Sequence, residues 1–308
     1  MKLLTHYARQ EKRPDAAPGT EPGRRNGFAR PADLVLIGHA GFATDRTPNG
    51  MARYVGGSGF AAAFAASALL DGGVGLVTQV GDDFDLGHLR RLPLDLEGVA
   101  VVPGATATFV IDQRADGSLE FGSDLGVAAE PRFDLFPASY FEASHVHLGT
   151  APPRQQLAWL DFIRDKGCRA RISVDMFEPF VAAEPDTCRG MCDRADLVFL
   201  NEAEFRGIYA GKSQPRGPVI LKHGPGGAEF LVAGVRCPVL APAVEELDPI
   251  GAGEILAGAF LALHTRGLPK YEALTYAVGA ATASVTEFGV AGPGVTRELL
   301  RVRDELGL

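Results

Sequence analysis

The sequence predicts an α/β protein with a mostly parallel sheet that helices cover on both faces. Two observations support this prediction. Short apolar segments typical of buried strands alternate with helical patterns along most of the chain. The 308 residues, 46% of them hydrophobic, suffice to bury the core of one large domain. We therefore expect a single α/β domain over residues 31–308.

Each element of this domain has its own pattern. Apolar runs that end in glycine or a polar residue predict strands at 33–38, 74–80, 145–148, 171–175, 196–200 and 218–222. Apolar or amphipathic runs predict helices at 60–70, 155–166, 254–265 and 270–288. Two hairpins stand apart from this alternation, one at 106–121 around Asp116-Gly117 and one at 229–240.

The first 30 residues differ from the rest in composition. They carry a net charge of +4 and are rich in proline, glycine and arginine, which predicts a disordered leader over 1–30. They lack the apolar run of a secretory signal, and nowhere do 18 consecutive apolar residues predict a membrane span. The net charge of the whole chain is −8, which argues against nucleic acid as a partner.

The cysteines predict the compartment. Cys168, Cys188, Cys192 and Cys237 do not complete a zinc site with each other or with nearby histidines. Reduced thiols are therefore expected, which indicates a cytoplasmic protein.

Polar side chains gather at the predicted ends of the strands. Asp175, Asn201 and Lys222 each end a strand, and Glu204 follows one of them closely. Ligands of parallel sheets bind beyond the carboxyl ends of the strands. The sequence therefore predicts a polar site at this edge.

A Gly251-Ala252-Gly253 turn precedes the predicted helix at 254–265. The first N–H groups of a helix have no internal partner, and small residues let an anion approach them. The turn can therefore hold a phosphoryl group, and Glu254 can accept a proton from an attacking hydroxyl. A first-turn glutamate that only stabilises the helix dipole is the alternative at this position.

Five motifs occur in the order found in the ribokinase-like sugar kinases of the PfkB family, which this chain resembles over about residues 33–300. They are Gly56-Gly57, Val80-Gly-Asp-Asp83, Asn201-x-x-Glu204, Lys222-His-Gly224-Pro-Gly-Gly227 and Asp248-Pro-Ile-Gly-Ala-Gly-Glu254. The last of these is the most specific.

The resemblance implies a fold and an activity. The fold would be a three-layer α/β/α ribokinase-like core with a small β lid, contributed by about 44–55 and 105–121. The activity would be transfer of the γ-phosphoryl group of ATP, with Mg²⁺, to an alcohol of a sugar, nucleoside or related small molecule. A monovalent cation near Asp248 and a homodimer formed through the lid are further expectations.

The resemblance also implies roles for individual residues. Glu254 would be the catalytic base, and Gly251, Ala252 and Gly253 would form the anion hole. The residues expected to bind the nucleotide are Asn201, Glu204, Lys222, Gly224, Gly227, Ala280 and Ala283, with Glu204 holding Mg²⁺ through water. The residues expected to bind the acceptor are Asp45, Gly56, Gly57, Ser58 and Asp175.

The chain also departs from the family pattern. Glu254 stands where the family has aspartate, and Lys222 stands where it has threonine. The asparagine expected after Gly56-Gly57 falls near Phe60 or Ala61. These departures predict an unusual acceptor pocket, and they keep a second hypothesis open: a catalytically weak nucleotide- or metabolite-binding protein on the same fold. Lys222 either contacts ATP phosphates or lies in solvent.

Two other motifs point to different chemistry. Gly57–Ala62 fits a dinucleotide-binding fingerprint, but 51–55 is a poor central strand and no acid follows at the ribose position. His145 and His147 share one face of a strand, which favours a packed pair over a metal site. We therefore expect neither an oxidoreductase nor a histidine metal centre.

Overall fold

The computed structural model describes residues 32–70, 72–115, 119–209 and 215–308. The predicted leader and the Asp116-Gly117 turn lie outside these residues. Within them, the main sheet has nine strands. Their order across the sheet is β13 (Val235–Val239), β12 (Ala228–Val232), β11 (Val219–Lys222), β10 (Leu197–Asn201), β9 (Arg171–Asp175), β8 (His145–Leu148), β1 (Leu34–Ile37), β4 (Val74–Gly81) and β5 (Val99–Val102).

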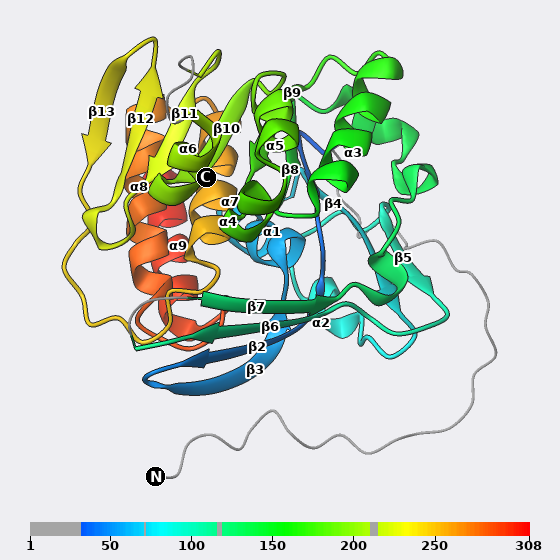
Figure 1. The fold of residues 1–308 in the computed structure, drawn as a ribbon, viewed down its shortest axis with the longest axis horizontal. Coiled ribbons are helices and arrows are strands. Elements are labelled where there is room, and N and C mark those ends of the chain that lie inside the picture. The colour runs from blue at the N-terminus through cyan, green and yellow to red at the C-terminus, as the bar shows by residue number, and fades with distance from the viewer. Residues whose placement is uncertain (1–31, 71, 116–118, 210–214) are drawn as a thin grey trace.

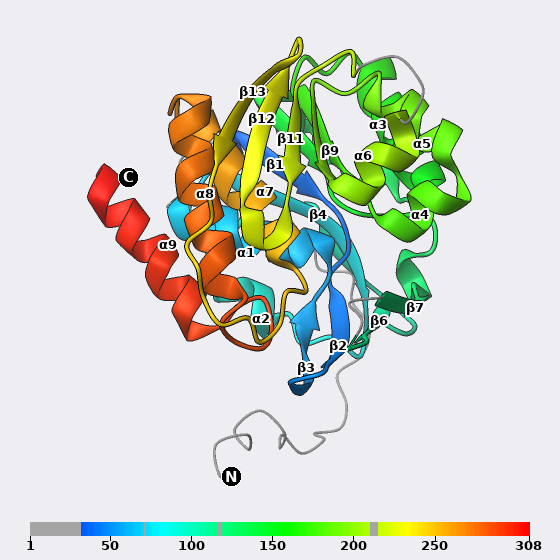
Figure 2. The same ribbon diagram turned by 60° about the vertical axis from the view of Figure 1, so that its left-hand side comes forward.

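The strands from β11 to β5 run parallel, and β12 and β13 add an antiparallel hairpin at one edge. Helices cover both faces of this sheet (Figures 1 and 2). One layer consists of α1 (Ser58–Leu69), α7 (Ala252–Thr265), α8 (Lys270–Ser284) and α9 (Pro293–Leu306). The other consists of α3 (Pro153–Asp165), α4 (Glu178–Ala183), α5 (Pro185–Cys192) and α6 (Glu202–Tyr209).

Successive residues of β1 show why the sheet needs both layers. Leu34 and Leu36 face the core under α1 and α7, whereas Val35 and Ile37 face the core under α3. A strand exposes alternate residues to opposite faces, so a continuously apolar strand must be covered twice. The three-layer α/β/α prediction is confirmed.

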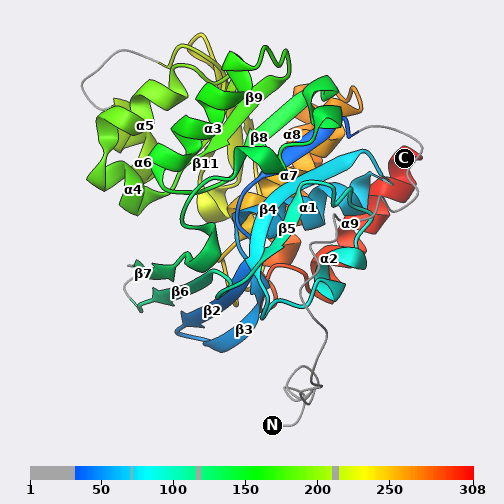
Figure 3. The same ribbon diagram turned by 90° about the vertical axis from the view of Figure 1, so that its right-hand side faces the viewer.

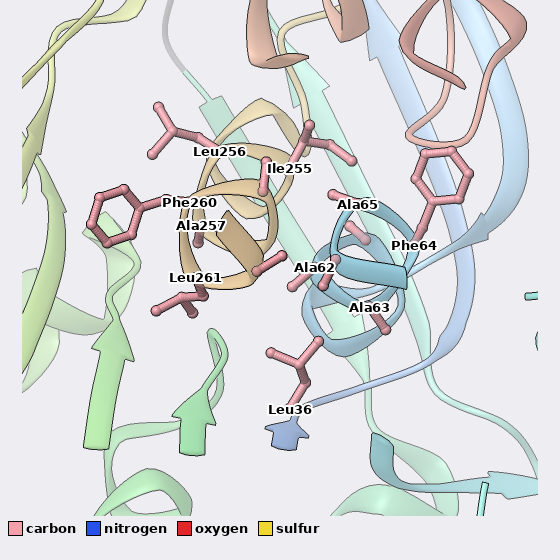
Figure 4. Close-up of a cluster of buried hydrophobic side chains, with 14 of the residues drawn as sticks. Leu36, Ala62, Ala63, Phe64, Ala65, Ile255, Leu256, Ala257, Phe260 and Leu261 are labelled. Carbon is pink, nitrogen blue, oxygen red and sulfur yellow. The ribbon is translucent and has the colours of Figure 1, made fainter. Parts of the chain in front are cut away.

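Helices α1 and α7 pack closely in the centre of one layer (Figure 4). Gly258 permits this contact, because a Cβ on it would lie 2.2 Å from the Ala62 carbonyl oxygen. Both helices are apolar on nearly all sides, as expected for buried helices. Their close packing brings the N-terminal ends of α1 and α7 to the same pocket.

A second, four-stranded sheet lies beyond one end of the main sheet (Figures 1 and 3). Its order is β3 (Gly50–Gly56), β2 (Gly41–Thr47), β6 (Thr108–Gln113) and β7 (Leu119–Asp124). It includes most of the two segments expected to form a lid. Only three residues, 38–40, separate β1 from β2, so the small sheet begins at the carboxyl edge of the main sheet.

The remaining described elements are short: α2 (Gly87–Arg90), η1 (Gly126–Ala128), η2 (Phe133–Leu135), η3 (Ala138–Glu142) and η4 (Gly224–Gly226). In the described part of the chain, no helix is long and apolar enough to cross a membrane.

The C-terminal helices differ from the prediction. Helix α8 ends at Ser284 rather than 288, and the Val285 carbonyl accepts the N–H groups of Leu247 and Asp248. Helix α9 was not predicted, although Pro293 at its start and buried Val295, Leu299 and Val302 are typical of an amphipathic helix.

Candidate active site

The polar ends of three strands meet as the sequence predicts. Asn201 and Lys222 are register partners on β10 and β11, and Asp175 ends the neighbouring strand β9. The Lys222 Nζ donates a hydrogen bond to Asp175 Oδ1 over 2.8 Å. The Lys222 side chain is 16% exposed, which contradicts the alternative that it lies in solvent.

The amine of Lys222 also lies against the Gly-Ala-Gly turn. A Cβ on Gly253 would be 3.1 Å from Lys222 Nζ. Gly251 has φ +83° at the N-cap of α7, and a Cβ there would lie 2.2 Å from a methyl group of Val290. The turn thus requires glycine, and it combines helix N–H groups with a lysine amine at one point.

Asp248 fixes the chain that leads into this turn. Its Oδ1 accepts the Ile250 N–H at 3.1 Å, and its Oδ2 accepts the Gly289 N–H at 3.4 Å. The Asp248 side chain is buried. It therefore has a structural role in positioning the N-terminus of α7.

Glu254 lies in the first turn of α7 and lines the pocket beside it. Burial and then the charge of Asp175 raise the pKa of Glu254, whereas Lys222 and a hydrogen bond with Thr150 act in the opposite direction. A carboxylate with a raised pKa is a stronger proton acceptor, which suits a general base.

Lys222 remains charged in these surroundings. Burial by itself lowers the pKa of Lys222, but the carboxylates of Asp175, Glu204 and Glu254 hold it above the ordinary lysine value. A fixed positive charge thus lies beside the turn that is expected to hold a phosphoryl group.

Asn201 and Glu204 form a reciprocal cap at the start of α6. Glu204 accepts the Asn201 N–H at 2.7 Å and its side-chain amide at 3.0 Å, and Asn201 Oδ1 accepts the Glu204 N–H at 2.8 Å. This is a capping-box arrangement. Burial raises the pKa of Glu204 to about 7. The motif therefore stabilises the fold, whatever else it binds.

A cleft that is open to solvent lies between the small sheet and the core. Five of the predicted residues line it: Asp45, Gly57, Ser58, Gly251 and Glu254. Gly57 has φ +99°, and a Cβ on it would lie 2.5 Å from the His39 carbonyl oxygen. Gly56 is buried just outside the cleft, with its Cα facing Ala43 and the Tyr54 ring.

The cleft lining is also rich in aromatic side chains. Its rings belong to Tyr54, Phe109, Phe121, Phe177 and Phe180. Phe121 of the small sheet meets Phe177 edge-on at 4.7 Å between ring centroids. None of the described residues that line the cleft is a lysine or an arginine.

The structure places the other predicted residues away from this cleft. Asp175 faces Lys222 rather than the cleft. Gly224 and Gly227 form the β11–β12 turn, where a Cβ on Gly227 would lie 2.1 Å from the Val239 carbonyl oxygen. Ala280 is 1% exposed and packs in the core, which argues against its contact with a ligand, whereas Ala283 is half-buried.

Several residues of the site were not predicted. Tyr54, Phe121 and Phe177 line the cleft, and so does His39, whose pKa burial lowers. Alternate residues Phe109 and Ile111 face the cleft, a period-two signal that the sequence does contain.

His145 and His147 form a packed pair. Both rings hydrogen bond to the Ser173 hydroxyl, at 2.9 and 2.8 Å, and burial lowers the pKa of both to about 3. Within the described ranges, no three histidine, cysteine or acidic residues are arranged to hold a metal ion.

The structure thus brings together a glycine-rich helix N-terminus with a lysine amine, a buried carboxylate and an adjoining cleft. Residues 33–297 match the pfkB family of carbohydrate kinases, so the chain belongs to this family and is a small-molecule kinase. The predicted resemblance, fold class and enzyme class are confirmed.

Relatives agree with this assignment. The chain is 33% identical over 277 residues to a cytidine kinase of Thermococcus kodakarensis, which covers 83% of this chain and 97% of the relative. It is 31% identical over 260 residues to an ATP-dependent ribose-1-phosphate kinase of Halopiger xanaduensis, covering 75% and 81% respectively. A ribokinase of Cryptococcus neoformans in complex with ADP shares the fold, with a TM-score of 0.72, 18% identity and coverage of 89% and 99%.

Proposed function

We propose that this kinase transfers the γ-phosphoryl group of ATP to a hydroxyl of a nucleoside, with Glu254 as general base. The observation that carries this proposal is the cleft itself. Glu254 and a cluster of aromatic side chains line the same cleft. A flat base can stack on the rings while the sugar hydroxyls reach the carboxylates. A relative named cytidine kinase supports a nucleoside acceptor.

The charges in the cleft disfavour a phosphorylated sugar, which another relative's name suggests. A phosphate dianion in a closed site needs arginine or lysine partners. The described lining offers Asp45 and Glu254 instead, and its histidine, His39, has a lowered pKa. An acceptor without a charge of its own fits these residues better.

The reaction follows from this placement. Glu254 takes the proton of the acceptor hydroxyl as its oxygen attacks the γ-phosphorus, and ADP leaves. The N–H groups of the Gly251–Gly253 turn and the Lys222 amine stabilise the charge on the transferred phosphoryl oxygens. The small sheet acts as a lid that excludes water.

In our proposal ATP lies on the side of the Gly251–Gly253 turn that is away from the acceptor cleft. There it runs along the Gly224–Gly227 turn and Ala283. Mg²⁺, when bound, neutralises the phosphates. Hard oxygen ligands suit it. Asp175 Oδ2 is buried without a partner, and Glu204 could act through water, so the carboxylates present fit this ion.

Three further expectations remain proposals. The four cysteines are free, which is consistent with a cytoplasmic protein. Met51 is exposed at the edge strand β3, where a homodimer through the lid could form. A monovalent cation near Asp248 has to share that carboxylate with two backbone N–H groups.

The test is ADP release with Mg-ATP across a panel of nucleosides, sugars and polyols. We expect a nucleoside to stimulate ADP release by the wild type, and Glu254→Gln to lower kcat by about 10²–10⁴-fold, the usual contribution of a general base. ATP binding, followed by calorimetry, should survive in the variant.

The glutamate at the base position makes a catalytically weak binding protein the second candidate. Glu254→Asp separates the two. If the wild type binds ATP and turns over no acceptor, and Glu254→Asp gains activity, the binding-protein hypothesis is favoured. If Glu254→Gln turns over a nucleoside normally, the base assignment is wrong.

A further inference from the structure

Tyr54 and Asp45 form a buried pair on the wall of the acceptor cleft. Asp45 lies on β2, and Tyr54 lies diagonally across from it on β3, where it pairs in register with Ala43. Both side chains line the cleft. The Tyr54 hydroxyl donates a hydrogen bond to Asp45 Oδ2.

The Tyr54 ring is held in place on two sides. A Cβ on Gly56 would lie 3.0 Å from the ring, and a Cβ on Gly289 would lie 3.2 Å from it. Two glycines thus make room for the ring, and neighbouring backbone limits its movement. The hydroxyl therefore keeps Asp45 Oδ2 occupied when an acceptor enters.

The other oxygen of Asp45 has no partner. Asp45 is 0% exposed, and its Oδ1 is buried without a hydrogen bond. Buried polar atoms in proteins are nearly always paired, so an oxygen left free beside a ligand cleft points to a donor on the ligand. Ser58, which lines the same cleft, does not supply this donor, because its hydroxyl donates to the Thr150 carbonyl at 2.7 Å.

A carboxylate with two free oxygens can accept hydrogen bonds from two neighbouring hydroxyls, one to each oxygen. In Asp45 the fixed Tyr54 hydroxyl already bonds to Oδ2, so Oδ1 is the oxygen left without a partner for a hydroxyl of the acceptor. We propose that Tyr54 is a specificity-determining residue that restricts Asp45 to a single hydroxyl of the acceptor sugar, so that one monodeoxyribonucleoside is phosphorylated nearly as well as the ribonucleoside. This inference rests on the proposed nucleoside kinase activity.

The experiment compares kcat/KM for a ribonucleoside and for its 2′-deoxy and 3′-deoxy forms with the same base. Loss of the hydroxyl that Asp45 binds should lower kcat/KM by about 10- to 100-fold, since it leaves a buried acceptor unpaired. Loss of the other hydroxyl should change it by less than about threefold. Equal losses for the two deoxy forms in the wild type overturn the inference.

Tyr54→Phe tests the cause. This variant frees Asp45 Oδ2 for the second hydroxyl, so both deoxy forms should now be poorer substrates than the ribonucleoside. Tyr271→Phe is the matched control, because Tyr271 is 54% exposed on α8, and it should keep the wild-type pattern. A Tyr54→Phe enzyme with the wild-type pattern contradicts the role of Tyr54.

The wild-type measurement stands even if Tyr54→Phe does not fold. It also separates the two proposals. If the wild type phosphorylates a nucleoside, the relative kcat/KM of the two deoxy forms decides this inference and leaves the proposed function standing. A wild type that phosphorylates another alcohol and no nucleoside overturns the proposed function, and the inference with it.

Discussion

The two sides of Glu254 have opposite chemistry. On one side, Asp175, Glu204 and Lys222 form a charged cluster built from the ends of parallel strands and the helix that follows. On the other side, the cleft is lined by five aromatic rings and lacks lysine and arginine among its described residues. In our proposal the charge that meets phosphate is therefore fixed at the ends of the main sheet, whereas the acceptor meets aromatic rings together with Asp45.

The two sides also differ in how they are held. The charged cluster lies at the end of the main sheet, whereas about a third of the cleft lining belongs to the small sheet, which contacts the core through side chains. Asn49 donates to the carbonyls of Glu246 and Leu247 at 3.1 and 3.3 Å, and Phe121 packs on Phe177. We therefore expect changes in the cluster to act on chemistry and changes in the small sheet to act on binding.

Among the variants that test the contrast between the charged cluster and the aromatic cleft, Lys222→Met should have the largest effect on catalysis. It removes the positive charge beside the anion turn, and we expect kcat to fall by about 10²–10³-fold, as for loss of an oxyanion donor. Lys222 lowers the pKa of Glu254, so its removal raises that pKa further. Because the base works only when deprotonated, the acid limb of the kcat profile should move to higher pH.

Lys166→Met is the control for this variant, because Lys166 is exposed at the end of α3. It should leave kcat and its pH profile unchanged. An unshifted acid limb in Lys222→Met, measured from pH 5 to 9, contradicts the electrostatic coupling between Lys222 and Glu254.

Phe121→Ala should have the next largest effect. Stacking on an aromatic ring contributes about 1–3 kcal/mol per base, so we expect the KM of the nucleoside to rise by about 10- to 100-fold. The KM of ATP should stay the same, because Phe121 lies on the acceptor side. Steady-state kinetics with each substrate varied in turn separate the two.

Phe121→Leu is the matched control, since it keeps apolar volume and loses only the flat ring. It should fall between the wild type and Phe121→Ala. Equal increases in both KM values would show that Phe121 supports the small sheet as a whole, and the contrast between the two sides of Glu254 would fail for this residue.

Asn49→Ala should have the smallest effect. The side chain is exposed and makes two hydrogen bonds to backbone carbonyls, each worth about 1 kcal/mol. We expect kcat/KM for both substrates to fall by less than about tenfold, because Asn49 joins the small sheet to the chain that precedes Asp248.

Thr47→Val provides a graded comparison for this prediction. The Thr47 hydroxyl makes a single bond to the Leu247 carbonyl, at 3.3 Å, so its loss should cost less than the loss of the Asn49 amide. If Asn49→Ala lowers kcat/KM for the acceptor and leaves kcat/KM for ATP unchanged, the small sheet is not linked to the ATP site through Asn49.

Much of the fold follows from local patterns. Buried parallel strands are continuous apolar runs, so β1, β4 and β8–β11 were predicted close to their observed bounds. The site at their carboxyl ends was predicted for the same reason. Helix α9 was overlooked although its pattern is clear, and α8 ends early because the Val285 carbonyl bonds to Leu247 and Asp248, far away in sequence.

The sequence by itself determined the family, the α/β/α class and the residues of the Gly-Ala-Gly turn, because each rests on short-range spacing. Only the tertiary structure decided which partners those residues meet. It placed Lys222 on Asp175 and Tyr54 on Asp45, pairs that are 47 and 9 residues apart. Burial, charge and hydrogen-bond partners depend on contacts between distant segments, and strand order and register set these contacts.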